Sequence, residues 1–348
     1  MDFSRLPLDE FSADEKQQER YGGLEYSNCC ICGSTKSSSL FSAPVQDHQK
    51  GIFDLDSFPI VKCSQCGLLY VNPRISSEAN NKYYEFSLPK DHDFLDKHFF
   101  ETYSIHKKRL DRYIRVIKKY KDGGHLLDIG CGNGYFLTRA KDSGYSVEGQ
   151  EISPLFINYC RQELNLVVHS GELEKLKLEV ASFDVITMFD VIEHVYHPDK
   201  LLNECKRLLK PGGILVITTH DAGNFLAKRY GHKWHMIYPI GHIYYFTSQT
   251  LRSLIKSADF KEMKSGLAYI VDETWYKTFF NYLASIFKSI FLRTLIIYLY
   301  KPVAKVFPFL TKWKMKIGSF FIDHQKLLFL AGDQVNFNDE IFSISTPS

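Results

Sequence analysis

Apolar residues in the middle of the chain occur in short runs that alternate with amphipathic stretches. The apolar runs predict strands at Leu126–Ile129, Tyr145–Glu151, Val167–Glu172 with its exit loop, Phe183–Phe189 and Ile214–Thr219. Helices are expected from Tyr135 onward, over His197–Leu209 and over Ser248–Ala258, with a turn at Lys210–Gly213. Strands that alternate with helices at this rhythm indicate a parallel, doubly wound α/β sheet. Upstream, apolar residues at helical spacing predict an amphipathic helix within His98–Lys121.

The composition is that of an ordinary globular protein. The chain has 348 residues, of which 45% are hydrophobic and 24% charged, and its net charge is +3. This length suggests two domains or one domain with additions, and the near-neutral balance gives no reason to expect a nucleic-acid partner. The first residues are polar and acidic, and no uncharged apolar run reaches the roughly 18 residues of a spanning helix. We therefore expect a cytoplasmic protein whose eight cysteines are thiols or metal ligands.

Four of the cysteines form two C-x2-C-G patterns, Cys29/Cys32 and Cys63/Cys66. Each pattern lets two thiolates of one tight turn point at the same ion, and two such turns supply the four ligands of a structural Zn²⁺. The sequence thus predicts a zinc ribbon with no open coordination position. Unliganded thiols and a redox pair are the alternatives, and Cys30 is an extra thiol that could compete as a ligand.

The most informative segment is HLLDIGCGNGYFL, in which a predicted strand, three glycines and a predicted helix follow each other. Gly130, Gly132 and Gly134 fit neither a G-x-G-x-x-G fingerprint nor a P-loop. They leave a bare backbone at the head of a helix, where a flat or charged ligand can bind. Asp128 adds a carboxylate for a cationic group such as an ammonium. Glu151 ends the next strand, where such sheets hold ribose hydroxyls.

The segments DIGCGNG, VEGQE, FDVITMFDVIEHV and LLKPGGILVITT resemble the successive motifs of class I S-adenosylmethionine-dependent methyltransferases, over about residues 105–270. With the cysteine pairs and CGLLYVNPR, the chain resembles zinc-ribbon methyltransferases, which include sugar C-methyltransferases and proteins associated with surface-polysaccharide synthesis. The resemblance implies a seven-stranded Rossmann-like sheet with S-adenosylmethionine as methyl donor. It also implies that Asp128 and the glycines frame the methionine moiety, Glu151 the ribose and Gly171–Glu172 the adenine. Asp190 would lie beside the methionine end.

Glu193 and His194 directly follow the predicted fourth strand, at the edge where ligands bind in these sheets. His194 could act as the base that removes a proton from the acceptor; alternatively it only caps a helix or bonds a loop. His242 resembles a recurrent histidine of the segment that covers the acceptor pocket. Together with His220, His232 and His235 it could bind a second metal, but no helical i, i+4 pair occurs, so this is not expected.

A late segment, Thr274–Ile322, contains eight Lys and Arg residues, many aromatic residues and no Asp or Glu. This composition is typical of helices at a membrane interface. A lid over the acceptor site and a homodimer contact are the alternatives. If the segment binds lipid, the protein would be peripheral at the inner face of the membrane.

The favoured function is a methyltransferase that modifies a sugar or glycan-type acceptor at carbon or oxygen. The alternative is an O-methyltransferase of a small quinol or phenolic acceptor, and a non-catalytic zinc-ribbon interaction protein is a weaker one. Nucleic acid is not expected as the acceptor, since no Asn/Asp-Pro-Pro-aromatic motif follows the fourth strand. The expected organisation is a flexible tail (1–25), zinc ribbon (26–74), linker and amphipathic helix (75–123), methyltransferase core (124–272), basic aromatic helical insertion (273–325) and last strand with tail (326–348).

Overall fold

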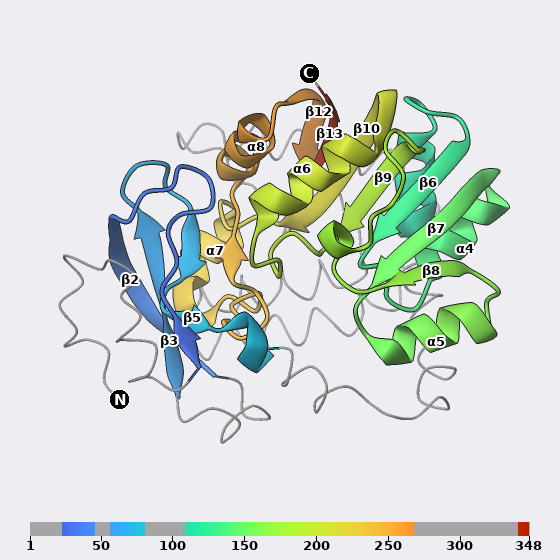
Figure 1. Ribbon diagram of the computed structural model, residues 1–348. Coiled ribbons are helices and arrows are strands. Elements are labelled where there is room, and N and C mark those ends of the chain that lie inside the picture. The colour runs from blue at the N-terminus through green and yellow to red at the C-terminus, as the bar shows by residue number, and fades with distance from the viewer. Residues whose placement is uncertain (1–22, 46–55, 81–106, 108, 268–339, 348) are drawn as a thin grey trace, which may run out of the picture. The chain divides into compact units, whose positions relative to one another are not determined.

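The computed structural model describes residues 23–45, 56–80, 107, 109–267 and 340–347 (Figure 1). Most of the predicted tail and the whole basic aromatic segment 274–322 lie outside these residues. Within the described part of the chain, no helix has the length and apolar character needed to cross a membrane.

The largest element is a seven-stranded sheet with the order β12-β13-β10-β9-β6-β7-β8. The strands from β10 through β9, β6 and β7 to β8 pair in parallel, whereas β13 is antiparallel to both β10 and β12. The expected doubly wound, seven-stranded α/β fold is therefore confirmed. The strands are β6 Gly124–Ile129, β7 Tyr145–Glu151, β8 Val167–Ser170, β9 Phe183–Phe189, β10 Leu209–His220, β12 Phe260–Leu267 and β13 Glu340–Pro347.

One local expectation differs from the structure. The segment Lys210–Gly213, expected as a turn, lies inside β10. The pairing of β10 with β9 shifts register between Leu209 and Ile214, and Gly212 has a φ of 70°. The chain thus absorbs the Pro-Gly-Gly sequence as an irregularity at the start of a strand rather than as a separate turn.

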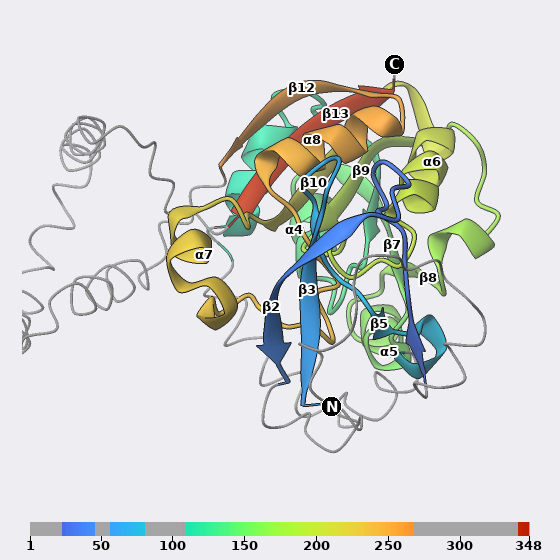
Figure 2. The same ribbon diagram turned by 90° about the vertical axis from the view of Figure 1, so that its left-hand side faces the viewer.

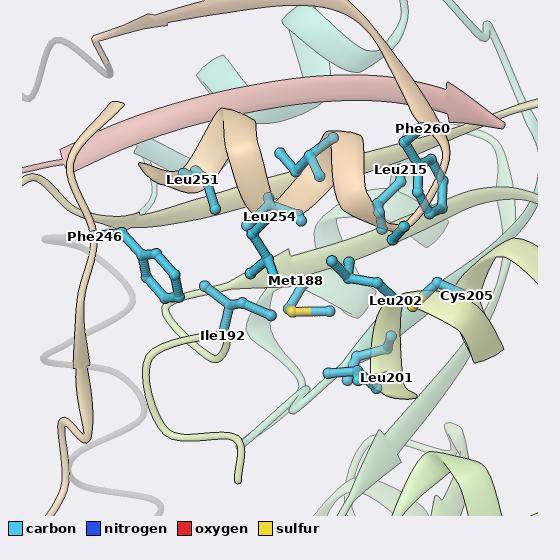
Figure 3. Close-up of a cluster of buried hydrophobic side chains, with 14 of the residues drawn as sticks. Met188, Ile192, Leu201, Leu202, Cys205, Leu215, Phe246, Leu251, Leu254 and Phe260 are labelled. Atoms are coloured by element: carbon cyan, nitrogen blue, oxygen red, sulfur yellow. The ribbon is translucent and has the colours of Figure 1, made fainter. Parts of the chain in front are cut away.

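Helices cover both faces of the sheet, because neighbouring residues of each buried strand point to opposite sides. Leu127, Ile186 and Leu215 pack with α6 (Pro198–Leu208) and α8 (Ser248–Ser257) in one cluster, part of which is drawn in Figure 3. The residues Leu126, Val185, Ile214 and Val216 pack with α4 (Tyr135–Asp142), α5 (Pro154–Gln162) and the helical residues 109–117 in another cluster. Full burial of each such side chain stabilises the fold by about 1.5–3 kcal/mol. Because both faces of the sheet are covered, polar side chains of the strands can reach a ligand only at the strand ends.

The predicted amphipathic helix is described at residue 107 and over 109–117. Its apolar positions Leu110, Tyr113, Ile114 and Ile117 are all buried, as the spacing indicated.

A second sheet of four strands has the order β11-β4-β3-β2 and is antiparallel throughout. Strands β2 and β3 lie side by side in Figure 2. The fourth strand, β11, comes from a much later part of the chain, after β10. The strands of this sheet are β2 Ser37–Pro44, β3 Ser57–Cys63, β4 Leu69–Val71 and β11 Tyr244–Tyr245, and a separate pair is formed by β1 Leu24–Glu25 and β5 Arg74–Ile75.

A buried arginine holds β5 against this late segment. Arg74 is 4% exposed, and its guanidinium donates to Glu25 Oε1 at 2.7 Å and to the hydroxyl of Tyr244 at 2.9 Å. The guanidinium also lies over the ring of Tyr196, with its central carbon 4.5 Å from the ring centroid. A charge this deeply buried needs such partners, because the cost of its desolvation is large.

Candidate functional site

The four predicted zinc ligands lie together at the end of the four-stranded sheet. The Sγ atoms of Cys29 and Cys66 are 3.3 Å apart, and those of Cys32 and Cys63 are 3.5 Å apart. Each C-x2-C-G motif forms a tight turn. The glycine that ends the motif, Gly33 or Gly67, adopts positive φ and donates its N–H to the carbonyl of the first cysteine, Cys29 or Cys63. This conformation explains why glycine follows each C-x2-C pattern.

The chemistry of these thiols also suits a metal. Burial raises the pKa of Cys63, but N–H groups of Cys66 and Gln65 more than offset it and lower the pKa to about 7. A thiol that ionises near neutral pH is ready to bind a cation. Four sulfurs within 4.8 Å of one another therefore fit the tetrahedral site of a zinc ribbon.

Cys30 is not part of this group. It lies against Tyr244, and burial raises the pKa of its thiol to about 12. Cys131, Cys160 and Cys205 are buried in the hydrophobic clusters.

The glycine loop follows β6 and leads into α4, and its three glycines have different structural roles. Gly130, Gly132 and Gly134 have φ values of 64°, 51° and 77°, which L side chains rarely adopt. A Cβ at Gly130 would lie 2.6 Å from Val191 Cγ2, and one at Gly134 would lie 2.9 Å from Cys160 Sγ. A Cβ at Gly132 would meet no atom within 4 Å. The first and third glycines thus allow close packing, while the middle one leaves open space beside the loop.

Two side chains at the end of β7 brace this loop. Glu151 Oε2 accepts a hydrogen bond from the N–H of Gly132 at 2.9 Å, and its Oε1 accepts from the N–H groups of Ile152 and Ser153. Gln150 Oε1 accepts from the N–H of Gly130 at 3.2 Å. Glu151 was predicted as a ribose ligand and does lie at the loop. Gln150 was missed, and only its place one residue earlier in β7 could have suggested it.

Asp128 lies at the end of β6 and is 4% exposed. The hydroxyl of Thr187 donates to its Oδ1 at 2.6 Å, from the neighbouring strand β9. Burial raises the pKa of this carboxyl to about 7, although the hydrogen bond of Thr187 acts against the shift. A bound cationic group would favour the ionised form of Asp128.

The other two predicted cofactor residues have different surroundings. Glu172 follows β8, is half exposed and pairs with Lys175 at 3.0 Å. Asp190, directly after β9, forms an ion pair with Arg109 and accepts a hydrogen bond from the hydroxyl of Thr218. Burial alone would raise the pKa of Asp190, but the positive charge of Arg109 shifts it downward. Arg109 was missed in the sequence, where it is one of several basic residues on a predicted helix.

The predicted catalytic residues meet where β9 and β10 end. Glu193 and His194 lie in the loop after β9, His220 ends β10, and His242 precedes β11. The ring centroids of His194 and His242 are 4.8 Å apart, and those of His220 and His242 are 4.7 Å apart. The carbonyl of Glu193 accepts from the N–H of Ile243 at 2.9 Å and so joins the two loops.

Backbone carbonyls fix the tautomers of two of these histidines. Nδ1 of His194 lies 2.8 Å from the carbonyl oxygen of Gly241, and Nδ1 of His242 lies 2.8 Å from that of Met236. Because a carbonyl can only accept, each Nδ1 carries a proton and each Nε2 keeps its lone pair. Burial lowers the pKa of His194, His220 and His242 to about 4 each. The three imidazoles are therefore neutral at physiological pH.

One oxygen of Glu193 and one ring nitrogen each of His220 and His242 lie within 4.8 Å of one another. Glu193 Oε1 is 3.4 Å from His220 Nε2. The sequence predicts no second metal site, because no i, i+4 histidine pair occurs. That criterion applies to ligands on one helix, and here the three residues come from one strand end and two loops.

Comparison with known families agrees with the fold. Residues 101–264 match the family model described as a methyltransferase domain. This match covers the glycine loop, the strands β6 to β10 and the histidine cluster. Together with the seven-stranded sheet it shows that this part of the chain is a methyltransferase domain of the S-adenosylmethionine-dependent class.

Among curated proteins, a ubiquinone biosynthesis O-methyltransferase of Coxiella burnetii is 34% identical over 113 residues, which are 31% of this chain and 48% of that protein. A second protein with this name, from Caulobacter vibrioides, is 36% identical over 104 residues, 28% of this chain and 41% of that protein. A probable S-adenosylmethionine-dependent methyltransferase of Mycolicibacterium smegmatis is 34% identical over 108 residues, which cover 31% and 42% of the two chains. The chain thus spans less than half the length of these relatives.

Solved structures with a similar fold include an S-adenosylmethionine-dependent methyltransferase of Archaeoglobus fulgidus. It is 19% identical, covers 73% of this chain and 99% of its own, and has a TM-score of 0.45. A methyltransferase of Thermotoga maritima, described as a possible histamine N-methyltransferase, is 24% identical, covers 53% and 81%, and has a TM-score of 0.42.

Proposed function

We propose that the protein transfers a methyl group from S-adenosylmethionine to a hydroxyl of a small phenolic or quinol-type acceptor. The observation that carries this proposal is the 34–36% identity to ubiquinone biosynthesis O-methyltransferases over 104–113 residues. None of the three curated relatives described above is named for the sugar or glycan acceptor that the sequence interpretation favours.

The glycine loop and its carboxylates would hold the donor. Gly132 has open space beside it, and Asp128 and Glu151 lie at the carboxyl ends of β6 and β7, where ligands bind in doubly wound sheets. Asp128 would take the ammonium of the methionine moiety, and Glu151 the ribose hydroxyls. Glu172 and Asp190 complete the proposed cofactor contacts.

His194 would accept the proton of the acceptor hydroxyl. Its Nδ1–H is directed to the carbonyl of Gly241, so the Nε2 lone pair is available. As the oxygen–carbon bond forms, the carbon–sulfur bond of the donor breaks, and the products are a methyl ether, S-adenosylhomocysteine and a proton. The protein contributes mainly alignment of the two reactants and exclusion of water.

We also propose that Cys29, Cys32, Cys63 and Cys66 bind a structural Zn²⁺. The support is the short distances between their sulfurs and the two glycine-terminated turns that present them. Four thiolates leave no position for a substrate, so this ion would stabilise the ribbon without taking part in methyl transfer.

An acceptor panel with labelled methyl donor tests the proposed function. We expect label transfer to catechol- or quinol-type compounds and none to nucleotide-linked deoxysugars. The opposite pattern would replace the phenolic acceptor by a sugar, and absence of S-adenosylmethionine binding in calorimetry would refute the enzyme assignment altogether.

His194→Gln tests the role of the histidine. It should leave cofactor affinity unchanged and lower turnover on the order of 10²–10⁴-fold. His232→Ala, at an exposed position in η4 (Gly231–Lys233), is the matched control and should keep full turnover. A fully active His194→Gln protein would remove His194 as the proton acceptor.

A further inference from the structure

Three side chains that commonly bind metals surround one point at the carboxyl edge of the large sheet. Glu193 comes from the loop after β9, His220 from the end of β10 and His242 from the segment before β11. One donor atom from each lies within 4.8 Å of the others, and the Glu193–His220 separation of 3.4 Å suits two ligands of a single ion. The segments are far apart in the sequence, so the fold itself assembles this group.

The donor atoms are in the state that a metal requires. Metal-binding histidines usually donate their second N–H to a backbone carbonyl or a carboxylate, which fixes the ring. His242 does so through Nδ1 and Met236, which leaves Nε2 with a lone pair.

The group is also well shielded from solvent. Glu193 is 1% exposed, and its Oε1 lies 3.4 Å from Nε2 of His220, whose side chain is 18% exposed. A cation bound between these atoms would be largely removed from water, which strengthens its attraction to the carboxylate.

We propose that Glu193, His220 and His242 bind a divalent first-row transition cation with at least one coordination position open. Two imidazoles and one carboxylate suit Zn²⁺, Co²⁺ or Fe²⁺ better than Mg²⁺ or Ca²⁺, which prefer all-oxygen sites. The site lies beside His194, whose ring is 4.8 Å from that of His242. Bound there, a cation would hold the acceptor oxygen and lower the pKa of its hydroxyl, so that His194 takes the proton more easily. This role rests on the proposed function, whereas the binding of the ion does not.

Metal content and the cobalt spectrum of the full-length protein test the proposal. The purified protein is loaded with Zn²⁺ and then dialysed exhaustively against metal-free buffer. We expect it to retain two equivalents of zinc, one in the four-cysteine group and one at Glu193, His220 and His242. Substitution with Co²⁺ should give sulfur-to-cobalt charge-transfer bands from the first group and separate ligand-field bands of a nitrogen–oxygen site. A wild-type protein that binds a single equivalent, with only the thiolate spectrum, would overturn the proposal without any mutant.

Variants locate the second ion. His220→Ala and His242→Ala should each lose one equivalent and the nitrogen–oxygen bands while they keep the thiolate bands and S-adenosylmethionine binding. His232→Ala should keep both equivalents, and His220→Asn and His242→Asn serve if the alanine variants do not fold. Retention of two equivalents in both histidine variants would contradict the assignment. Loss of the second ion without loss of methyl transfer would refute its role, and a second ion in a protein that methylates no phenol would refute the proposed function alone.

Discussion

The two groups of proposed metal ligands in this protein are built in opposite ways. The four cysteines of the ribbon come from two short turns, each with its ligands three residues apart and a glycine behind them. Glu193, His220 and His242 come from the loop after β9, the end of β10 and the segment before β11. Local sequence spacing brings each pair of cysteines together, whereas the second group is assembled only when the large sheet has formed.

The two groups are also expected to have different roles, one in the stability of the fold and the other in ligand binding. A closed thiolate site would stabilise the two turns at the end of the four-stranded sheet. An edge of neutral imidazoles and carboxylates above a fully covered sheet can instead hold ligands. The variants below test whether stability depends on the ribbon and ligand binding on the sheet edge.

The largest effect is expected from Cys63→Ser. Loss of one thiolate should release the ribbon zinc and lower the free energy of unfolding by about 4–5 kcal/mol or more, as for other lost metal sites. Cys30→Ser, one residue from Cys29 but outside the group, should keep its zinc. Metal analysis and thermal unfolding measure both. Equal zinc content in the two variants would show that Cys63 is not a zinc ligand.

A smaller effect, of opposite sign for stability and binding, is expected from Asp128→Asn. The pKa of Asp128 is about 7 in the folded chain and near 3.9 in the unfolded chain, so the folded state holds the extra proton between these values. Wild-type stability contributed by this group is therefore lost as pH rises from about 4 to 7, by about 1.4 kcal/mol for each unit of difference. Asparagine does not titrate and should make the protein more stable than wild type at pH 8, but not at pH 4.

Urea unfolding at the two pH values measures this change, and calorimetry at pH 8 should show weaker S-adenosylmethionine binding. Thr187→Val is a useful companion, because it removes the hydroxyl that bonds Asp128 but keeps the carboxylate. A stability difference between Asp128→Asn and wild type that is the same at both pH values would show that the carboxyl is not buried in its neutral form.

The smallest effect is expected from Tyr244→Phe, at the boundary of the two regions. The change removes the hydroxyl that accepts a 2.9 Å hydrogen bond from the buried Arg74. A hydrogen bond to a charged group contributes about 1.5–3 kcal/mol, so thermal unfolding should shift by several degrees while zinc content stays the same. Tyr230→Phe, in α7 (Phe225–Tyr230), is the control with little expected change. If Tyr244→Phe has no effect on unfolding, Glu25 and Tyr196 are sufficient to hold Arg74.

The sequence predicts those parts of the molecule that local patterns encode. The strand β9 was predicted with its observed ends, because FDVITMF is an apolar run bounded by polar residues. The four cysteines and the positions of Gly130, Gly132 and Gly134 were also readable, since their spacing is itself the structural requirement.

Contacts between distant segments were not predictable in the same way. The partner of Asp190 is Arg109, on a helix that packs on the sheet, and no spacing rule links the two positions. The grouping of His220 with Glu193 depends on β9 and β10 being neighbours, which requires the strand order. The same holds for the pairing of the short strand at Tyr244–Tyr245 with β4, because the two strands are far apart in the sequence.

That last pairing limits how the protein can be divided. One edge strand of the ribbon sheet is β11, and Val71 in β4 donates its N–H to the carbonyl of Ile243 just before it. A fragment cut after β5 would carry all four cysteines but would expose the bare edge of β4, and such edges recruit strands from other chains. Grafts and truncations that treat the ribbon as a portable module should therefore oligomerise through β4 unless they carry a substitute for Tyr244–Tyr245.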